Sequence, residues 1–86
     1  MEKKKIVLFK SPTCGPCKLF APVCKQVAEQ VQVEYEEIDV TTESGLTIAK
    51  QYNISHSGCA LYIVDNEVKI TWERPVPPAK MLADLG

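Results

Sequence analysis

Two cysteines stand two residues apart in the segment Cys14-Gly15-Pro16-Cys17. The residues that follow repeat apolar side chains every three or four positions, which predicts an amphipathic helix from Cys17 to about Gln30. The free backbone N–H groups and the dipole at the start of such a helix stabilise an anion, so the Cys14 thiol should ionise more readily than a free cysteine. We therefore expect Cys14 to attack a disulfide and Cys17 to resolve the mixed disulfide that forms.

The two residues between the cysteines suit a compact loop that leads into a helix. Pro16 fits the first helical turn, because its missing N–H leaves no unmet partner there. Zinc sites use the same cysteine spacing, so half of a zinc site or a buried structural pair is the alternative. A structural zinc site would normally bring a second C-x-x-C or an H-x-x-x-H, and the sequence has neither.

The composition limits the class of protein. The 86 residues carry a net charge of −1, which gives no general electrostatic reason to bind nucleic acid or an anionic membrane. The apolar run Ile6-Val7-Leu8-Phe9 is too short for a membrane span or a signal peptide. We expect one domain over residues 1–86, a monomer of the cytoplasm. Because thiols stay reduced there, the four cysteines favour redox chemistry or metal binding over structural disulfides.

The hydrophobic pattern predicts an α/β fold with the order β-α-β-α-β-β-α. A strand–helix–strand crossover joins parallel strands and a terminal hairpin adds an antiparallel pair, which gives one mixed four-stranded sheet flanked by helices. The cysteine pair then lies at the carboxyl end of the first strand, where open α/β sheets place their ligand sites. The expected elements are strands at 5–10, 33–40 with an irregularity at 36–37, 60–64 and 68–72, and helices at 17–30 with a kink at Pro22, 42–51 and 79–85.

The segment from Cys14 to Pro22 looks like the active-site helix of thioredoxins, including the basic Lys18 after the second cysteine. The order of elements resembles the trimmed thioredoxin fold of glutaredoxins and short thioredoxin-like proteins. The segment 52–54 and the hairpin 61–68 match the second half of that family. The resemblance implies a thiol–disulfide oxidoreductase with Cys14 and Cys17 as its redox pair. It also implies disulfide-containing protein or small-molecule substrates, no organic cofactor, and a thioredoxin reductase or glutathione as electron donor.

The sequence also departs from the family pattern. Thr13 stands where thioredoxins usually have tryptophan, and Leu8 stands where many have a buried acid. The family's cis-proline position falls on Gly58, where we expect a trans or mobile bond, since a cis bond before a non-proline residue costs about 2.5–4 kcal/mol. The resemblance assigns the loop and substrate docking to the following residues: Thr13, Gly15, Pro16, Ser57, Gly58 and Cys59.

Other cysteines and charged residues leave alternatives open. Cys59 is either a small buried residue at a strand start or a third thiol beside the redox pair, whereas Cys24 is expected in the core. A metal or iron–sulfur module would use Cys14, Cys17 and Cys59, with His56 or a partner completing the ligands. A non-enzymatic interaction module on the same fold is a further alternative. The acidic residues near the second strand are interpreted as a solvated surface: Glu34, Glu36, Glu37 and Asp39.

Overall fold

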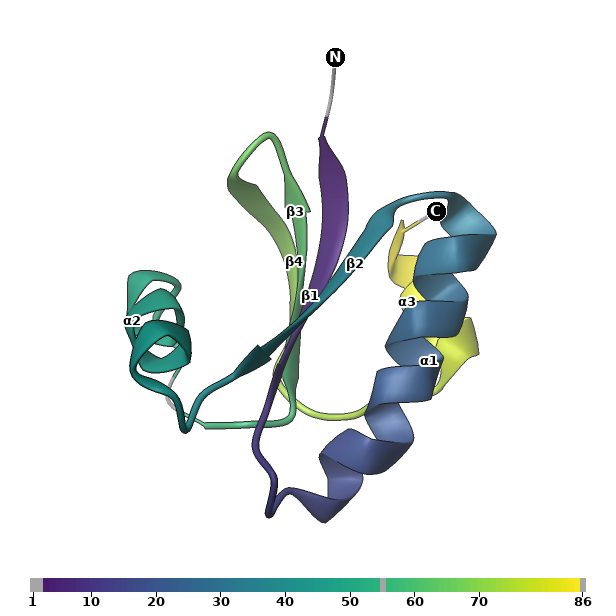
Figure 1. Ribbon diagram of the computed structural model, residues 1–86. Helices are drawn as coiled ribbons and strands as arrows, with labels where there is room; N and C mark the ends of the chain where they lie inside the picture. Colours follow the sequence, from purple (N-terminus) through teal and green to yellow (C-terminus); the bar gives the residue numbers. More distant parts are fainter. Residues whose placement is uncertain (1–2, 55, 86) are drawn as a thin grey trace.

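The computed structural model describes residues 3–54 and 56–85. Its elements follow one another in the predicted order, so the β-α-β-α-β-β-α arrangement is confirmed (Figure 1). No helix in these two ranges is both long enough and apolar enough to cross a membrane. The bounds of the elements are β1 (Lys4–Lys10), α1 (Gly15–Val31), β2 (Glu34–Asp39), α2 (Glu43–Gln51), β3 (Cys59–Val64), β4 (Glu67–Trp72) and α3 (Pro78–Leu85).

The four strands form one mixed sheet in the order β2-β1-β3-β4, as predicted. β1 runs parallel to β2, and the pairs β1–β3 and β3–β4 are antiparallel. The β1–β2 register is continuous, so the predicted irregularity at residues 36–37 is wrong. The break in register lies instead between Tyr62 and Ile63, where β3 pairs with β4.

The misleading pattern in β2 has a physical cause. Tyr35 packs against the hydrophobic cluster on one face of the sheet, whereas Ile38 belongs to the cluster on the other face. A strand that is covered on both faces does not have to keep its apolar residues in one alternating phase. The apolar residues of β2 thus shift by one position along the strand because they turn from one face of the sheet to the other, and the strand itself stays regular.

Helices cover both faces of the sheet. α1 and α3 lie on one face and α2 lies on the other (Figure 1). β1 contributes alternate residues to the hydrophobic clusters on the two faces, which explains its uninterrupted apolar run. Ile6 and Leu8 belong to the cluster beneath α1, here called the α1-side cluster, and Val7 and Phe9 belong to the cluster beneath α2. Burial on both faces fixes β1 as the central strand from which the cysteine loop departs.

α1 begins earlier than predicted, at Gly15. Cys14 is its N-cap residue, and the Cys14 sulfur accepts the Cys17 backbone N–H at 3.2 Å. Pro16 lies in the first turn, where its missing N–H needs no partner. The helix continues through Pro22 to Val31 and is closed by Gln32 in the left-handed conformation, with φ 60°. Cys14 and Cys17 therefore belong to the helix start itself and not to a loop before it.

The last helix is attached to the sheet by a polar contact. The indole N–H of Trp72 donates to a carboxylate oxygen of Asp84 at 2.9 Å. Trp72 is buried in the α1-side cluster together with Met81 of α3. This contact and the shared cluster hold α3 beside α1.

A close backbone approach joins α2 to the end of β2. Thr42 caps α2 by accepting the Gly45 backbone N–H at 3.0 Å, and its own hydroxyl donates to the Asp39 carbonyl at 2.8 Å. A Cβ atom on Gly45 would overlap that same Asp39 carbonyl oxygen. Only glycine therefore allows α2 to approach the strand end this closely.

We expect Gly45→Ala to destabilise the fold, because the Asp39 backbone or α2 must move to admit the methyl group. The expected loss is about 1–3 kcal/mol, the usual cost of overpacking. Urea unfolding measures it. Gly15→Ala is the matched control, since a Cβ atom there meets nothing within 4 Å, and its stability should be unchanged or slightly higher. Equal stability of the two variants would contradict the close approach.

Candidate functional site

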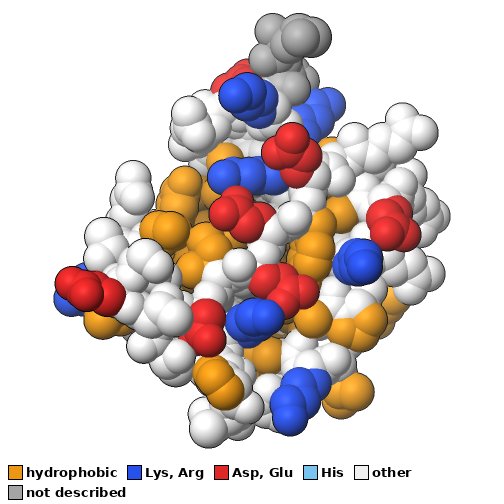
Figure 2. Space-filling view, in the orientation of Figure 1, with side chains coloured by type: hydrophobic (Ala, Val, Ile, Leu, Met, Phe, Trp, Pro, Cys, Tyr) orange, Lys and Arg blue, Asp and Glu red, His pale blue; other side chains and the backbone are white. Residues whose placement is uncertain are grey.

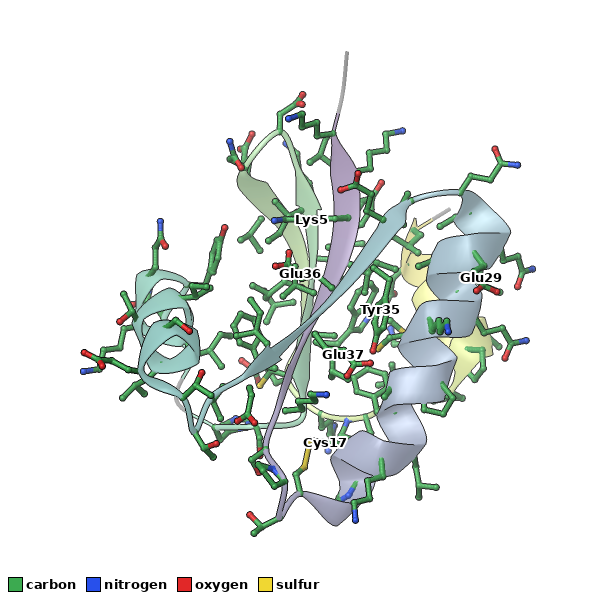
Figure 3. The ribbon with its side chains drawn as sticks, in the orientation of Figure 1. Lys5, Cys17, Glu29, Tyr35, Glu36 and Glu37 are labelled. Atoms are coloured by element: carbon green, nitrogen blue, oxygen red, sulfur yellow. A yellow bond between two sulfur atoms is a disulfide. The ribbon has the colours of Figure 1, made fainter. Side chains whose placement is uncertain are left out.

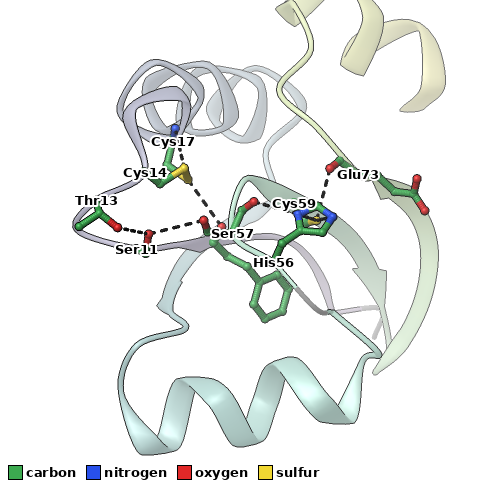
Figure 4. The surroundings of a disulfide bond; sticks show 9 residues. Ser11, Thr13, Cys14, Cys17, His56, Ser57, Cys59 and Glu73 are labelled. Carbon is green, nitrogen blue, oxygen red and sulfur yellow. Dashed lines mark hydrogen bonds between the residues drawn. A yellow bond between two sulfur atoms is a disulfide. The ribbon is translucent and has the colours of Figure 1, made fainter.

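Cys14 and Cys17 are joined by a disulfide at the carboxyl end of β1, with their Cα atoms 5.3 Å apart (Figure 4). The two sulfurs differ in environment. Cys14 is half-buried at the helix start, whereas Cys17 is only 3% exposed. A reagent that approaches from solvent therefore meets Cys14 first. The flanking residues Thr13, Gly15 and Pro16 are exposed and form the surface around it.

Hydroxyl groups link the cysteine loop to the segment that precedes β3. The Cys14 backbone N–H donates to the Ser11 carbonyl at 3.1 Å. The Ser11 hydroxyl lies 3.4 Å from the Thr13 hydroxyl and donates to the Ser57 hydroxyl at 3.5 Å (Figure 4). Ser57 is thus brought next to the loop, although the two are far apart in the sequence.

Gly58 brings its backbone close to the redox pair. Its N–H donates to the Phe9 carbonyl at 2.7 Å, and the Cys17 sulfur lies 4.0 Å from the same oxygen. A Cβ atom on Gly58 would lie 4.0 Å from the Cys17 sulfur. Gly58 has φ +89°, a conformation that suits glycine. No peptide bond in the described part of the chain is cis, and the bond before Gly58 is trans, in agreement with our expectation.

Cys59 does not join the redox pair. Side chains alternate along a strand, so Cys59 shares the α2 side of β3 with Leu61, opposite the side that α1 covers. Its sulfur lies 3.4 Å from Nδ1 of His56 and donates to the Glu73 carbonyl at 3.4 Å (Figure 4). Of the two alternatives for Cys59, the structure shows the buried residue at a strand start, and the convergence of three thiols is not found. Residues 3–54 and 56–85 contain no group of three His, Cys, Asp or Glu placed to hold a metal.

Burial raises the pKa of both remaining thiols. Cys24 is fully buried in the α1-side cluster, as predicted. Its burial, with a smaller effect of the nearby Glu37 carboxylate, raises the pKa of the Cys24 thiol to about 12. Burial also raises the pKa of the Cys59 thiol, with a contribution from Glu73. Both residues are poor nucleophiles at neutral pH.

Two charged residues that the sequence did not assign to the site share a cavity with Cys17. A cavity of about 360 Å³ is lined by Cys17, Lys18 and Pro12 together with Lys10 and Glu37. Lys10 and Glu37 form an ion pair across β1 and β2. The alternation of side chains along β2 could have indicated this position, because it places Glu37 on the same face as the partly buried Tyr35.

The acidic residues of β2 are thus divided between two faces. Glu36 pairs with Lys5 at 3.3 Å on one side of the strand, whereas Glu37 points towards α1 (Figure 3). Figure 2 shows acidic and basic side chains next to one another over this face of the molecule, with no large area of one sign. The predicted solvated acidic surface is confirmed for Glu34, Glu36 and Glu37, which are exposed, whereas Asp39 is half-buried. Glu37 also borders the cavity.

Comparisons with known proteins agree with this geometry. The family model described as Thioredoxin matches residues 1–81. The chain is 33% identical to the chloroplastic M-type thioredoxin of Spinacia oleracea over 93% of this chain and 44% of that protein. It is 37% identical to thioredoxin 1 of Synechococcus elongatus over 57% of this chain and 46% of that protein. The chain thus spans about half the length of these relatives.

Solved structures show the same fold. The reduced thioredoxin pre-protein of Schistosoma mansoni has a TM-score of 0.77 and 28% identity, over 94% of this chain and 74% of that one. Thioredoxin 1 of Thermosipho africanus has a TM-score of 0.82 and 18% identity, over 94% of this chain and 89% of that one, which is a likeness of fold alone. The fold is the thioredoxin fold, and its helix start carries a disulfide. The chain belongs to the thioredoxin family.

The conformation of Gly58 makes a prediction about substitutions there. Gly58→Ala should destabilise the protein by about 1–2 kcal/mol, because a side chain is unfavourable in this backbone region. Gly58→Pro should cost more, since proline cannot adopt φ +89° and also removes the N–H that donates to Phe9. Denaturant unfolding should rank wild type above alanine and alanine above proline. A proline variant as stable as wild type would show that the segment adopts another backbone conformation.

Proposed function

We propose that this protein is a thiol–disulfide oxidoreductase that acts as one domain over residues 1–86. One observation carries the proposal: the half-buried Cys14 and the buried Cys17 are in disulfide contact at the N-terminus of α1. The helix start favours a thiolate at Cys14, which is the attacking form of a cysteine. Membership of the thioredoxin family supports the same activity.

The proposed reaction passes two electrons to a disulfide substrate. In the reduced protein, the Cys14 thiolate attacks one sulfur of the substrate, whose S–S bond breaks, and the other substrate sulfur leaves as a thiolate. The Cys17 thiolate then attacks the Cys14 sulfur of the mixed disulfide. The second substrate sulfur leaves, and the bond between Cys14 and Cys17 forms. The substrate disulfide is reduced and the protein dithiol is oxidised.

We further propose that the substrate docks over the exposed rim of the disulfide. Thr13, Gly15 and Pro16 provide the exposed side of this rim. Across the disulfide, Ser57 and Gly58 provide backbone that a bound peptide can approach, because glycine leaves no side chain in its way. The buried Cys59 anchors this segment through its contact with the Glu73 carbonyl and does not itself meet the substrate.

The electron donor is proposed to be a thioredoxin reductase or glutathione, and the chain needs no organic cofactor for dithiol exchange. The two donors can be separated by their chemistry. With NADPH and a thioredoxin reductase, oxidised protein should be reduced in a coupled assay if the donor is the reductase. With glutathione, a mixed disulfide between glutathione and Cys14 should appear first and can be detected by mass.

Replacement of the two cysteines tests the assigned roles. Cys17→Ser should form a lasting mixed disulfide through Cys14 with a model disulfide substrate, because the resolving thiol is absent. Cys14→Ser should lose disulfide reductase activity. Non-reducing electrophoresis and mass spectrometry follow the adduct, and an insulin reduction assay follows the activity. If cells that carry Cys14→Ser in place of wild type show no loss of the protein's function, the fold serves as an interaction module instead.

The environments of the four thiols predict an order of labelling. In the reduced protein at neutral pH, a limiting amount of iodoacetamide should modify Cys14 first, since it is the accessible thiol at the helix start. Cys24 should stay unmodified until the protein unfolds, because it is buried and the pKa of its thiol is about 12. Peptide mapping by mass spectrometry reads the order. Early labelling of Cys24 in folded protein would contradict the core position.

A further inference from the structure

Cys17 and several charged side chains line the same cavity. The Cys17 side chain is 3% exposed, yet it lines the cavity of about 360 Å³ that Lys10 and Glu37 also line. The proposed reaction requires Cys17 to lose a proton before it can attack the mixed disulfide. On the α1 side of β1, the nearby Leu8 is apolar and fully buried and cannot take that proton. The cavity that Cys17 lines is the path by which the proton can leave.

The Glu37 carboxylate is held in a fixed orientation at this cavity. The Tyr35 hydroxyl donates to one oxygen at 2.8 Å, and the Lys10 ammonium donates to the other. These hydrogen bonds, led by that of Lys10, hold the pKa of Glu37 below its usual value, and the charge of Lys25 on α1 acts in the same direction. The carboxylate is therefore ionised at neutral pH and can accept a proton.

The other charged groups of the cavity are less suited to this task. Asp39 also lines it, but its carboxylate accepts the Thr41 backbone N–H at 2.8 Å and caps the turn after β2. Lys10 and Lys18 carry protons already and are donors. The buried Cys24, whose thiol also responds to the charge of Glu37, has its pKa raised and does not compete for a proton at neutral pH.

We propose that Glu37 is the base that accepts the Cys17 proton during resolution of the mixed disulfide, with Lys10 and Tyr35 as its positioning residues. The inference rests on the proposed function. A water molecule in the cavity takes the proton from the Cys17 sulfur and gives one to the Glu37 carboxylate. The Cys17 thiolate attacks the Cys14 sulfur, and the electron pair of the broken S–S bond stays on the departing substrate sulfur. Glu37 then returns the proton to solvent.

The first experiment measures resolution separately from attack. Reduced protein is mixed with the symmetric disulfide of thionitrobenzoate in a stopped-flow instrument. Attack by Cys14 releases one thionitrobenzoate and forms the mixed disulfide, and resolution by Cys17 releases the second, which is followed by its absorbance. Glu37→Gln should slow this release by about 100-fold at neutral pH, the lower range of general-base effects. Glu36→Gln is the matched control, because Glu36 is on the same strand with a lysine partner but faces away from α1. It should release thionitrobenzoate at the wild-type rate.

The second experiment uses the pH dependence of release, which a merely structural role would not shift. In wild type, the rate of thionitrobenzoate release should fall at acidic pH as Glu37 becomes protonated, which gives the pH–rate profile an acidic limb. Lys10→Met and Tyr35→Phe should move this acidic limb to higher pH, since each removes a hydrogen bond that keeps the Glu37 pKa low. Glu37→Gln should remove the limb. Unchanged limbs in all three variants would overturn the assignment.

Different results would contradict the proposed function and the role of Glu37. If wild type forms no adduct through Cys14 with any disulfide reagent, the proposed function is wrong. If the adduct forms and Glu37→Gln releases thionitrobenzoate as fast as wild type or faster, the function stands and the role of Glu37 is wrong. Circular dichroism and urea unfolding of each variant check that it is folded, and the pH shift of Tyr35→Phe tests the role independently if Glu37→Gln is unfolded.

Discussion

The carbonyl oxygen of Phe9 is the point at which three segments of this structure meet. It accepts the Gly58 N–H at 2.7 Å and lies 4.0 Å from the Cys17 sulfur. β1 is the central strand and is buried on both faces, so this oxygen has a fixed position. The start of α1 and the start of β3 are therefore set against the same atom. The left-handed conformation of Gly58 is the local requirement that makes the meeting possible.

Much of the fold could be predicted because its signals are local. The apolar run in β1 and the three-to-four spacing in α1 state directly which faces are buried. The turn of the β3–β4 hairpin is likewise local, since Asp65 and Asn66 both adopt positive φ, as a two-residue turn demands. The interpretation of β2 was wrong because the phase of its apolar residues depends on α1 and α2 together, and one strand's sequence does not show what covers each face.

Part of the site could be predicted from a short segment of sequence, and part depends on residues that are distant in the sequence. Cys14 and Cys17 could be found from spacing alone, because the helix start that brings them together lies in the same short segment. Glu37 and Cys59 depend on pairing between strands. Glu37 reaches the cavity because β2 lies beside β1 in the register observed. Cys59 points away because, as a residue of β3, it lies on the same side of the sheet as Leu61. A change of one position in a strand moves a side chain to the other face of the sheet.

The four cysteines have different environments because they lie on different faces of the sheet and at different depths. Cys14 and Cys17 share the α1 side with Cys24, but the helix start leaves Cys14 partly open while the core closes over Cys24. Cys59 occupies the opposite side, where its thiol donates to a backbone carbonyl. Cys17 therefore lies within disulfide distance of Cys14 at the same helix start, whereas the Cys59 thiol contacts His56 and the Glu73 carbonyl instead. In the proposed function, this arrangement would direct exchange to Cys14 and Cys17 while Cys24 and Cys59 remain in the protein.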